Sequence, residues 1–394
     1  MSAGQAWVIG NGRLVTPDEV VEDGVVVVSA GKIVYAGPAR DAPGSVWDGS
    51  VELDARGGYI CPGFIDGHVH GGGGADAMDA SPQALARMAQ AHAAHGTTAL
   101  LATTMSAPHE QLLGVADAVR RAQLSGTGGA RLLGLHLEGP YINPERAGAH
   151  HRAWLRPPAA AELEELYRVA GPALRTVTMA PELPGAVEAI RWLSARGITV
   201  SLGHTAASYE QAMAALDAGA QAATHLFNAM QALHHRSPGC AGAVLVDDRV
   251  RVELIADGVH VHPGVLRLAW RCKGAAGIML VTDCMRALGC PDGEYTLGDV
   301  DVVVRQGQVR VRDNPAALAG SLLTMDQAVR VMVQAVGVSL PDAVRMASLT
   351  PAEALGLAHR LGRLAAGYEA DVVVLNQDLE ATITMVAGEV VFQR

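Results

Sequence analysis

The stretch SPQALARMAQAHAAHGTTALLATT, residues 81–104, contains the repeating unit on which the fold prediction rests. Its first part predicts a helix, because Ser81 can cap the N-terminus, Pro82 suits the first turn and Gly96 can end it. The second part, 97–104, is a short apolar run of the length expected for a buried strand. A helix followed directly by a buried strand is the building unit of α/β folds.

The same alternation runs through the middle of the chain. Further helical patterns occupy 184–197 and 208–219, and another follows the last strand near 324–336. Eight strands alternating with eight helices predict a (β/α)8 TIM-like barrel. An open doubly wound sheet is the alternative, but no Gly-X-Gly-X-X-Gly turn follows any strand. The predicted strands are 60–66, 97–104, 131–137, 175–181, 198–203, 221–227, 251–257 and 277–282.

Both ends of the chain are rich in β-branched residues and differ from the middle. The segment 24–38 predicts a hairpin, and 367–394 has the same character. We therefore expect 1–58 and 367–394 to form one small β-sandwich domain beside a barrel of residues 59–366. After the last barrel strand, 293–315 predicts an inserted β-hairpin on the face of the barrel where loops vary freely.

Composition limits the classes of partner and compartment. The 394 residues carry a formal net charge of -10, which argues against a nucleic-acid partner, because such a face needs clustered Lys and Arg. No apolar run is long enough to span a membrane, and residues 1–20 lack the features of a signal peptide. The five cysteines show no Cys-X-X-Cys spacing and predict no disulfide framework, which favours a cytoplasmic location.

Side chains with metal-ligand chemistry gather at the predicted C-terminal ends of the barrel strands. The first strand ends in His68 and His70, whose imidazoles project from one face of a strand. A His-X-His pair alone is more often an ordinary polar pair, but four other strand ends carry similar groups. Because all these ends share one rim of the barrel, we expect the six side chains to meet there. The further candidates are Glu138, His204, His225 and Asp283.

Imidazole and carboxylate ligands together favour Zn²⁺ or another divalent metal such as Fe, Co or Mn. Glu138, His204 and His225 would make a three-ligand site with an open position for water. His68 and His70 could hold a second ion, with Glu138 as the bridge. The residues allow either one or two ions.

Asp283 supplies the acid–base group that hydrolysis needs. A bound metal lowers the pKa of its water toward neutrality. Asp283 would take that proton as general base and deliver it to the leaving group as general acid. The pattern therefore predicts metal-assisted hydrolysis.

These ligand-type residues, in a barrel beside a β-domain made from both termini, resemble the amidohydrolase superfamily. Many dinuclear members of that superfamily bridge their metals with a carbamylated lysine on a middle strand. This chain has no lysine between His70 and His204. The lysine-bridged branch is therefore excluded, and Glu138 must serve as the bridge instead.

Segments across essentially the whole chain resemble, in order and spacing, the family of N-acetylglucosamine-6-phosphate deacetylases. The most specific are HLEGP (136–140) and THLFNAM (224–230); the others are PGFIDGHVHG, RAGAH, SLGHT, IADGVHVHP, VTD and LAGSLLTMDQAVR. The resemblance implies hydrolysis of N-acetyl-D-glucosamine 6-phosphate to D-glucosamine 6-phosphate and acetate, in amino-sugar catabolism and cell-wall recycling. Cys284 departs from the family pattern, but strand alternation points it away from Asp283, so we assign it to packing.

The loop 143–158 is long and polar, as the lids of active sites often are. It carries His150, for which the resemblance implies a contact to the acetamide or the sugar. A sugar phosphate also needs cationic or backbone N–H donors. Arg146 and Arg152 of this loop are weaker candidates for that role than the residues that the resemblance implies.

The resemblance implies further substrate contacts outside the loop. Asn228 and Ala229 would bind the phosphate through amide and main-chain donors. Arg236 would reach the phosphate of the neighbouring subunit in a homodimer. His260, at the end of the seventh strand, would contact the substrate.

Two other functions remain open at this point. A related metal-dependent deacylase of another N-acetyl amino sugar or of an N-acyl amino acid would share the metal site. It would be distinguished by its choice of substrate. A catalytically silent homologue is disfavoured, because every ligand candidate and Asp283 are present.

Overall fold

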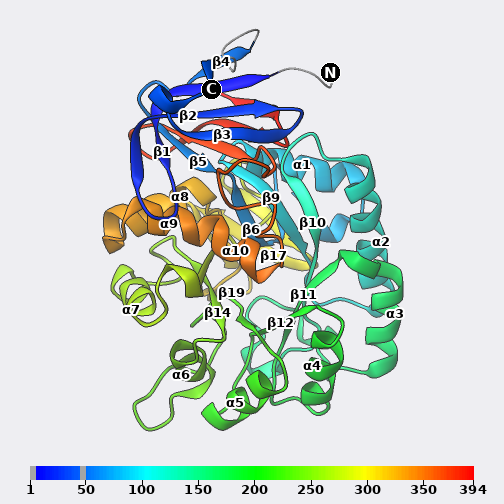
Figure 1. Ribbon diagram of the computed structural model, residues 1–394. Helices are drawn as coiled ribbons and strands as arrows, with labels where there is room; N and C mark the ends of the chain where they lie inside the picture. The colour runs from blue at the N-terminus through cyan, green and yellow to red at the C-terminus, as the bar shows by residue number, and fades with distance from the viewer. Residues whose placement is uncertain (1–5, 45–49) are drawn as a thin grey trace.

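The middle of the chain forms eight parallel strands arranged as a barrel (Figure 1). The computed structural model describes residues 6–44 and 50–394, so 1–5 and 45–49 of the predicted β-domain lie outside it. Each barrel strand pairs with the one before it, which confirms the predicted (β/α)8 barrel. The strands are β6 (Phe64–Val69), β9 (Thr97–Thr103), β10 (Arg131–Glu138), β11 (Leu174–Met179), β12 (Thr199–Leu202), β13 (Ala222–Ala223), β14 (Arg251–Ile255) and β15 (Ile278–Val281).

The barrel closes between its first and last strands. The main-chain N–H of Asp283 donates to the carbonyl of His68 at 2.9 Å. Below this bond, the buried Asp66 carboxylate accepts from both the main-chain N–H and the hydroxyl of Thr282, at 3.2 and 2.6 Å. Closure therefore places the His68 strand end directly beside Asp283.

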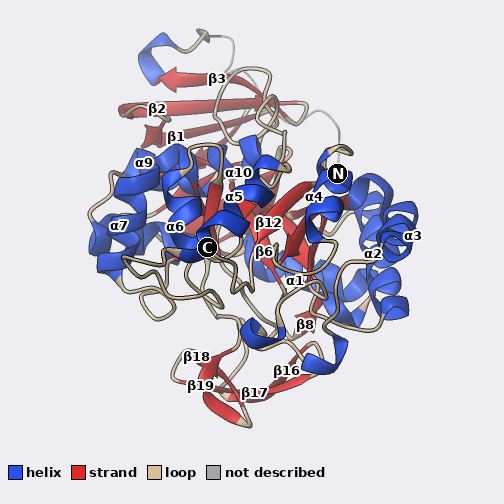
Figure 2. Ribbon diagram, turned by 90° about the horizontal axis from the view of Figure 1, so that it is seen from below, coloured by secondary structure: helices blue, strands red, loops and turns tan. Residues whose placement is uncertain are grey.

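Helices cover the outside of the barrel (Figure 2). They begin where the sequence predicts: the Ser81 hydroxyl accepts from the N–H of Ala84 and caps the first helix. In the described part of the chain, no helix is long and apolar enough to cross a membrane. The helices are α1 (Pro82–Ala93), α2 (His109–Ser125), α3 (Ala160–Ala170), α4 (Ala186–Ser194), α5 (Tyr209–Asp217), α6 (Gly239–Val246), α7 (Pro263–Lys273), α8 (Met325–Val331, continued by a π-helix over Met332–Val336), α9 (Leu340–Ala347) and α10 (Leu349–Ala354).

The two ends of the chain form a separate β-domain, as predicted. Its strands make one connected eight-stranded sheet, in the order β22-β21-β20-β5-β1-β2-β3 with β4 beside β1. The sheet folds back on itself: the N–H of Ile33 donates to the carbonyl of Tyr368, and both halves share one apolar core. The strands are β1 (Trp7–Val15), β2 (Val20–Ser29), β3 (Lys32–Pro38), β4 (Val51–Asp54), β5 (Tyr59–Pro62), β20 (Val372–Leu375), β21 (Ala381–Val386) and β22 (Glu389–Gln393).

The predicted first barrel strand, 60–66, is two strands in the structure. β5 pairs with β20 and β1 in the terminal sheet, and β6 begins the barrel at Phe64. The break falls at Gly63, where a Cβ would lie 2.2 Å from the Thr98 side chain. Only glycine fits this close approach, and the contact comes from a residue that sequence pattern alone does not place there.

The insertion after β15 is larger than the predicted hairpin at 293–315. Four antiparallel strands form a small sheet: β16 (Gly293–Leu297), β17 (Val300–Arg305), β18 (Gln308–Val311) and β19 (Asn314–Leu318). The fourth strand contains Pro315, which a sequence pattern reads as a turn but which an edge strand tolerates. Figure 2 shows this sheet projecting from the molecule on the side away from β1, β2 and β3. A two-stranded ribbon, β7 (Gly71–Gly72) and β8 (Ala75–Asp76), lies in the glycine-rich turn after His70.

Candidate metal centre

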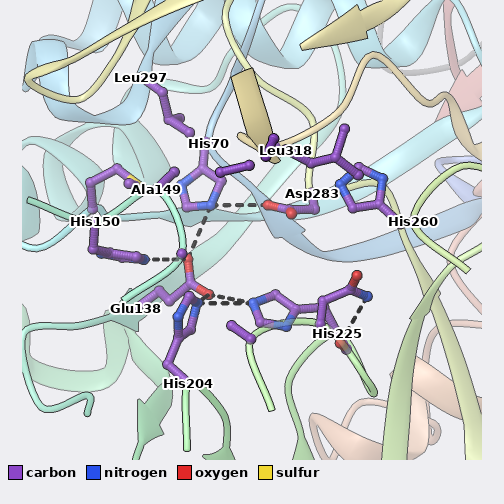
Figure 3. Close-up of a pocket in the computed structure, with 17 residues that line it drawn as sticks. His70, Glu138, Ala149, His150, His204, His225, His260, Asp283, Leu297 and Leu318 are labelled. Atoms are coloured by element: carbon purple, nitrogen blue, oxygen red, sulfur yellow. Dashed lines mark hydrogen bonds and ion pairs between the residues drawn. The ribbon is translucent and has the colours of Figure 1, made fainter. Parts of the chain in front are cut away.

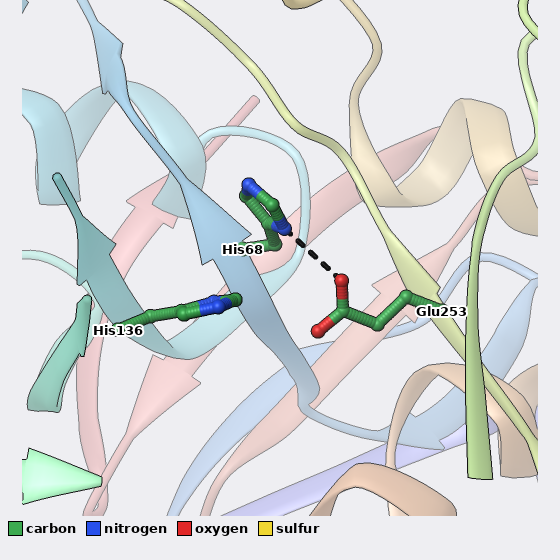
Figure 4. A group of neighbouring side chains, drawn as sticks. All are labelled: His68, His136 and Glu253. Atoms are coloured by element: carbon green, nitrogen blue, oxygen red, sulfur yellow. Dashed lines mark hydrogen bonds and ion pairs between the residues drawn. The ribbon is translucent and has the colours of Figure 1, made fainter. Parts of the chain in front are cut away.

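The ligand-type side chains predicted at five strand ends meet in one buried cluster at the end of the barrel. Figure 3 shows this cluster without His68, which is drawn in Figure 4. Glu138 lies at its middle. Its Oε1 is 3.1 Å from His204 Nε2 and 3.0 Å from His225 Nε2. Its Oε2 is 3.1 Å from His70 Nε2 and 3.3 Å from His68 Nε2. One carboxylate therefore faces two pairs of histidines, one pair on each oxygen.

Within each pair the two imidazoles turn the same nitrogen toward each other. The Nε2 atoms are 3.3 Å apart in the His68–His70 pair and 3.1 Å apart in the His204–His225 pair. His68, His70 and Asp283 place their ligand atoms within 4.8 Å of one another. Four converging imidazole nitrogens beside two carboxylates are the donor set that Zn²⁺ and similar ions prefer. The residues present therefore fit a divalent metal.

Asp283 lies directly after β15, with Oδ1 3.1 Å from His70 Nε2 and 3.5 Å from His68 Nε2. Burial alone would raise the pKa of Asp283, but the hydrogen bond from His70 and the charge of His68 outweigh it and lower the pKa to about 2. Burial would likewise raise the pKa of Glu138, and the charge of His68 holds it well below its usual value instead. Both carboxylates are therefore ionised at neutral pH.

His68 is supported from behind by Glu253, a residue that sequence reasoning missed (Figure 4). The Nδ1–H of His68 donates to Glu253 Oε2 at 3.0 Å, and the main-chain N–H of His225 donates to the same oxygen at 3.2 Å. This bond keeps a proton on Nδ1, so in the neutral ring the Nε2 lone pair of His68 would face a metal. A carboxylate in the middle of the strand β14, Arg251–Ile255, was the available signal, because a buried Glu needs partners.

His136 packs against the ring of His68 with 4.7 Å between centroids (Figure 4). Its Nδ1 lies 3.0 Å from the carbonyl of Gly67, and its Nε2 lies 2.7 Å from the Thr178 hydroxyl. Burial lowers the pKa of His136 to about 4, so the ring is neutral and both nitrogens are engaged. His136 therefore supports the ring of His68 and is not itself a ligand. Its place two residues before Glu138, on the same face of β10, was the sequence signal that it lies near the site.

His204 is held by the loop 143–158 rather than by a strand. Its Nδ1–H donates to the carbonyl of Arg146 at 2.8 Å, which again leaves Nε2 free toward Glu138. The backbone of His204 has φ of 48°, in the left-handed region. This conformation is unfavourable for a residue with a Cβ and persists only where the surroundings hold it.

His150 also approaches Glu138, with Nε2 3.4 Å from Oε2. The main-chain N–H of Ser106 donates to His150 Nδ1 at 3.0 Å. Burial lowers the pKa of His150 to about 4, so the ring is neutral and its single proton lies on Nε2. His150 therefore presents a donor to the cavity and not a free lone pair for a metal.

A cavity of about 290 Å³ opens above the cluster (Figure 3). Of the predicted substrate residues, His150, Asn228, Ala229 and His260 line it. Arg236 does not: it is exposed, with Nη1 2.7 Å from His235 Nε2. The insertion contributes part of the wall, which the sequence did not predict, through Leu297, Ala316, Ala317 and Leu318.

His260 is oriented by Asp257, whose Oδ2 accepts from His260 Nδ1 at 2.6 Å. Burial would raise the pKa of Asp257, but the hydrogen bond from His260 lowers it. Asp257 is thus an ionised acceptor that fixes the ring of a cavity-lining histidine.

Comparison with known proteins relates this site to a family. A sequence model of the amidohydrolase family matches residues 59–391. The chain is 44% identical over 333 residues to N-acetylglucosamine-6-phosphate deacetylase from Vibrio furnissii, covering 84% of this chain and 83% of that one. It is 41% identical over 377 residues to N-acetylgalactosamine-6-phosphate deacetylase from Escherichia coli O157:H7, covering 96% and 97%.

Among solved structures, the chain resembles a mutant of N-acetyl-D-glucosamine-6-phosphate deacetylase from Mycobacterium smegmatis in complex with N-acetyl-D-glucosamine-6-phosphate. The TM-score is 0.93 at 38% identity, covering 99% of this chain and 100% of that chain. The enzyme of the same name from Thermotoga maritima superposes with a TM-score of 0.87 at 36% identity, covering 98% and 100%.

Proposed function

Because the chain belongs to the amidohydrolase family, we propose that its barrel centre hydrolyses N-acetyl-D-glucosamine 6-phosphate to D-glucosamine 6-phosphate and acetate. The observation that carries the proposal is the convergence of four imidazole nitrogens on Glu138, beside an ionised Asp283 at the floor of a cavity. The names of the relatives from V. furnissii and M. smegmatis supply the substrate. Such a reaction serves amino-sugar catabolism and cell-wall recycling.

We propose zinc as the metal, bound by Glu138, His204 and His225, with room for a second ion at His68 and His70. When bound, it would supply electrophilic activation of the acetamide carbonyl and a water of lowered pKa. The ionised oxygens of Glu138 face both pairs, so this side chain could hold both ions in place of a lysine.

Asp283 moves the proton. Its low pKa keeps it ionised at neutral pH, so it can accept a proton from the attacking water. The protonated Asp283 then donates to the amine nitrogen as the amide bond breaks, which releases glucosamine 6-phosphate and acetate. His150 and His260 line the same cavity and would orient the acetamide and the sugar, His150 through its Nε2–H.

We propose that the phosphate is bound by Asn228 and Ala229, which line the cavity on the His225 side. Arg236 is exposed on the isolated chain, as a residue that serves a neighbouring subunit must be. From the family resemblance we propose a homodimer in which Arg236 reaches the partner's phosphate. From the cysteine pattern we place the protein in the cytoplasm.

A second candidate substrate is N-acetyl-D-galactosamine 6-phosphate. The relative of that name matches 96% of this chain, more than the V. furnissii relative does. The two substrates share the acetamide and the phosphate and differ in the configuration of one hydroxyl. The metal centre would treat them alike, so the choice lies in the walls of the cavity.

The test is acetate release by metal-loaded protein from four sugars: the 6-phosphates of N-acetylglucosamine and N-acetylgalactosamine, and both unphosphorylated sugars. We expect the highest kcat/KM on N-acetyl-D-glucosamine 6-phosphate. Preference for N-acetyl-D-galactosamine 6-phosphate would support the proposed deacetylation but make that sugar phosphate the substrate. Equal activity with and without phosphate would contradict the roles of Asn228, Ala229 and Arg236, and no acetate from any sugar would contradict the proposed function.

A further inference from the structure

Glu182 lies in the loop after β11, at a strand end to which no role is yet assigned. Its Oε1 accepts from the Asn143 side-chain amide at 2.8 Å and from the main-chain N–H of Ala206 at 2.6 Å. Its Oε2 accepts from the Thr205 hydroxyl at 2.6 Å. Within residues 6–44 and 50–394, Glu182 forms no ion pair, so these three neutral donors are its hydrogen-bond partners. A half-buried carboxylate thus serves as a common acceptor for two other loops.

Those donors surround His204. Asn143 opens the loop 143–158, and its main-chain N–H donates to the carbonyl of His204 at 3.0 Å. Thr205 and Ala206 directly follow His204 in the chain. The main-chain N–H of Thr205 donates in turn to the carbonyl of Ala229 at 3.1 Å. Glu182 therefore joins the start of the cavity loop to the two residues that follow one metal-facing histidine.

The backbone conformation near Glu182 is unfavourable by itself. His204 and Ala229 have φ of 48° and 50°, so both occupy the left-handed region without being glycine. Gly148 of the loop lies so close that a Cβ there would be 3.1 Å from His204 Cε1. Such an arrangement needs external hydrogen bonds to persist, and bonds to an ionised carboxylate are the stronger kind.

We propose that Glu182 is a positioning residue that holds His204 and the segment 143–150 in the arrangement that binds metal and lines the substrate cavity. This inference rests on the proposed metal-dependent function. Among the described residues, the Glu182 side chain forms no hydrogen bond or ion pair with Glu138 or with another residue of the ligand cluster. It acts through Asn143 and Thr205, beside His204. Glu253, by contrast, bonds the side chain of His68.

The variants are Glu182→Ala, which removes all three bonds, and Glu182→Gln, which keeps Oε1 and removes the charge. A matched control is Asp326→Ala. Asp326 also accepts three bonds, from Thr324, Gln327 and the N–H of Ala381, but it joins α8 to β21 and does not line the cavity. It differs from Glu182 in one further contact, because His95 Nδ1 lies 3.4 Å from its Oδ1. Each full-length variant is examined for metal affinity by Co²⁺ titration, for KM and kcat, and for thermal stability.

We expect Glu182→Ala to weaken binding of one Co²⁺ about tenfold and to raise KM, with Glu182→Gln restoring part of both effects. Asp326→Ala should lower Tm and leave Co²⁺ affinity unchanged. Amide hydrogen exchange of metal-free protein gives a second readout: exchange in 143–150 and 203–207 should rise in Glu182→Ala alone. Unchanged Co²⁺ affinity together with unchanged exchange would overturn the inference. If wild-type protein binds no Co²⁺, the proposed function fails, while the exchange result still decides whether Glu182 positions these segments.

Discussion

The two pairs of histidines that face Glu138 are supported in different ways. His68 lies in β6, inside the barrel, and donates to the carboxylate of Glu253. His204 lies after the end of β12 and donates to the carbonyl of Arg146, in a loop that lines the cavity. In the first pair His68 is held by the barrel itself. In the second pair His204 is held by a loop, so at that histidine metal retention and closure around the substrate depend on the same hydrogen bonds.

The largest expected effect concerns the barrel-held side, where Asp283 faces His70. Asp283→Asn keeps the shape of the side chain and removes the proton acceptor. We expect kcat to fall about 10³-fold, within the range for loss of a general acid–base group, with metal content unchanged. Steady-state kinetics and metal analysis of the same preparation measure this. A variant that loses metal in proportion to activity would make Asp283 a ligand and not the acid–base group.

The turn after His70 gives a pH-dependent prediction. His92 of α1 donates from Nε2 to the carbonyl of Gly71 at 2.9 Å, and burial lowers its pKa to about 4. Between pH 6.5 and 4 the unfolded chain binds a proton at His92 that the folded chain does not. Stability contributed by the neutral ring is therefore present above pH 6.5 and is lost as the pH falls toward 4.

His92→Gln keeps a donor for Gly71 and cannot titrate. Relative to this variant, wild-type protein should lose about 3 kcal/mol of unfolding free energy on going from pH 7 to pH 4. Urea unfolding of both proteins at several pH values measures the difference. A constant difference across that range would contradict the assignment of a neutral buried His92.

Glu253→Gln sharpens the comparison between the two pairs. Gln at 253 is a weaker acceptor for His68 Nδ1–H, so one metal should bind about 10-fold to 100-fold less tightly. The His204–His225 pair keeps its loop carbonyl, so the other metal should be retained. Stepwise Co²⁺ titration resolves the two affinities. Equal weakening of both would show that Glu253 supports the pairs jointly, through its second bond to the N–H of His225.

The smallest expected effect is at the rim of the cavity. The indole N–H of Trp154 donates to Asp299 Oδ2 at 2.8 Å and ties the loop 143–158 to the turn between β16 and β17. Trp154→Phe removes this exposed bond, which is worth about 1 kcal/mol, and keeps an aromatic ring. KM should rise a few-fold with kcat nearly unchanged. A fall in kcat without a change in KM would place the loop's role in the chemical step.

Sequence pattern predicted the barrel and the convergence of ligand-type side chains at its rim because both depend on local features. Strand ends such as HLEGP carry ligand-type side chains, and a barrel brings such ends to one rim. What it missed depends on contacts between distant residues. Glu253 meets His68 across the barrel, and Glu182 reads in the sequence as a solvated loop residue. The fourth strand of the insertion was hidden by Pro315. Gly63 lies between β5 and β6, where the Thr98 side chain leaves no room for a Cβ. No local pattern reveals this contact.

The most direct test is acetate release from N-acetyl-D-glucosamine 6-phosphate by metal-stripped protein, before and after Zn²⁺ is restored. The arrangement around Glu138 predicts that stripped protein releases no acetate and that Zn²⁺ restores turnover. Full activity in the stripped protein, or no acetate after Zn²⁺ is bound, would contradict the assignment of this cluster as the metal centre of a deacetylase.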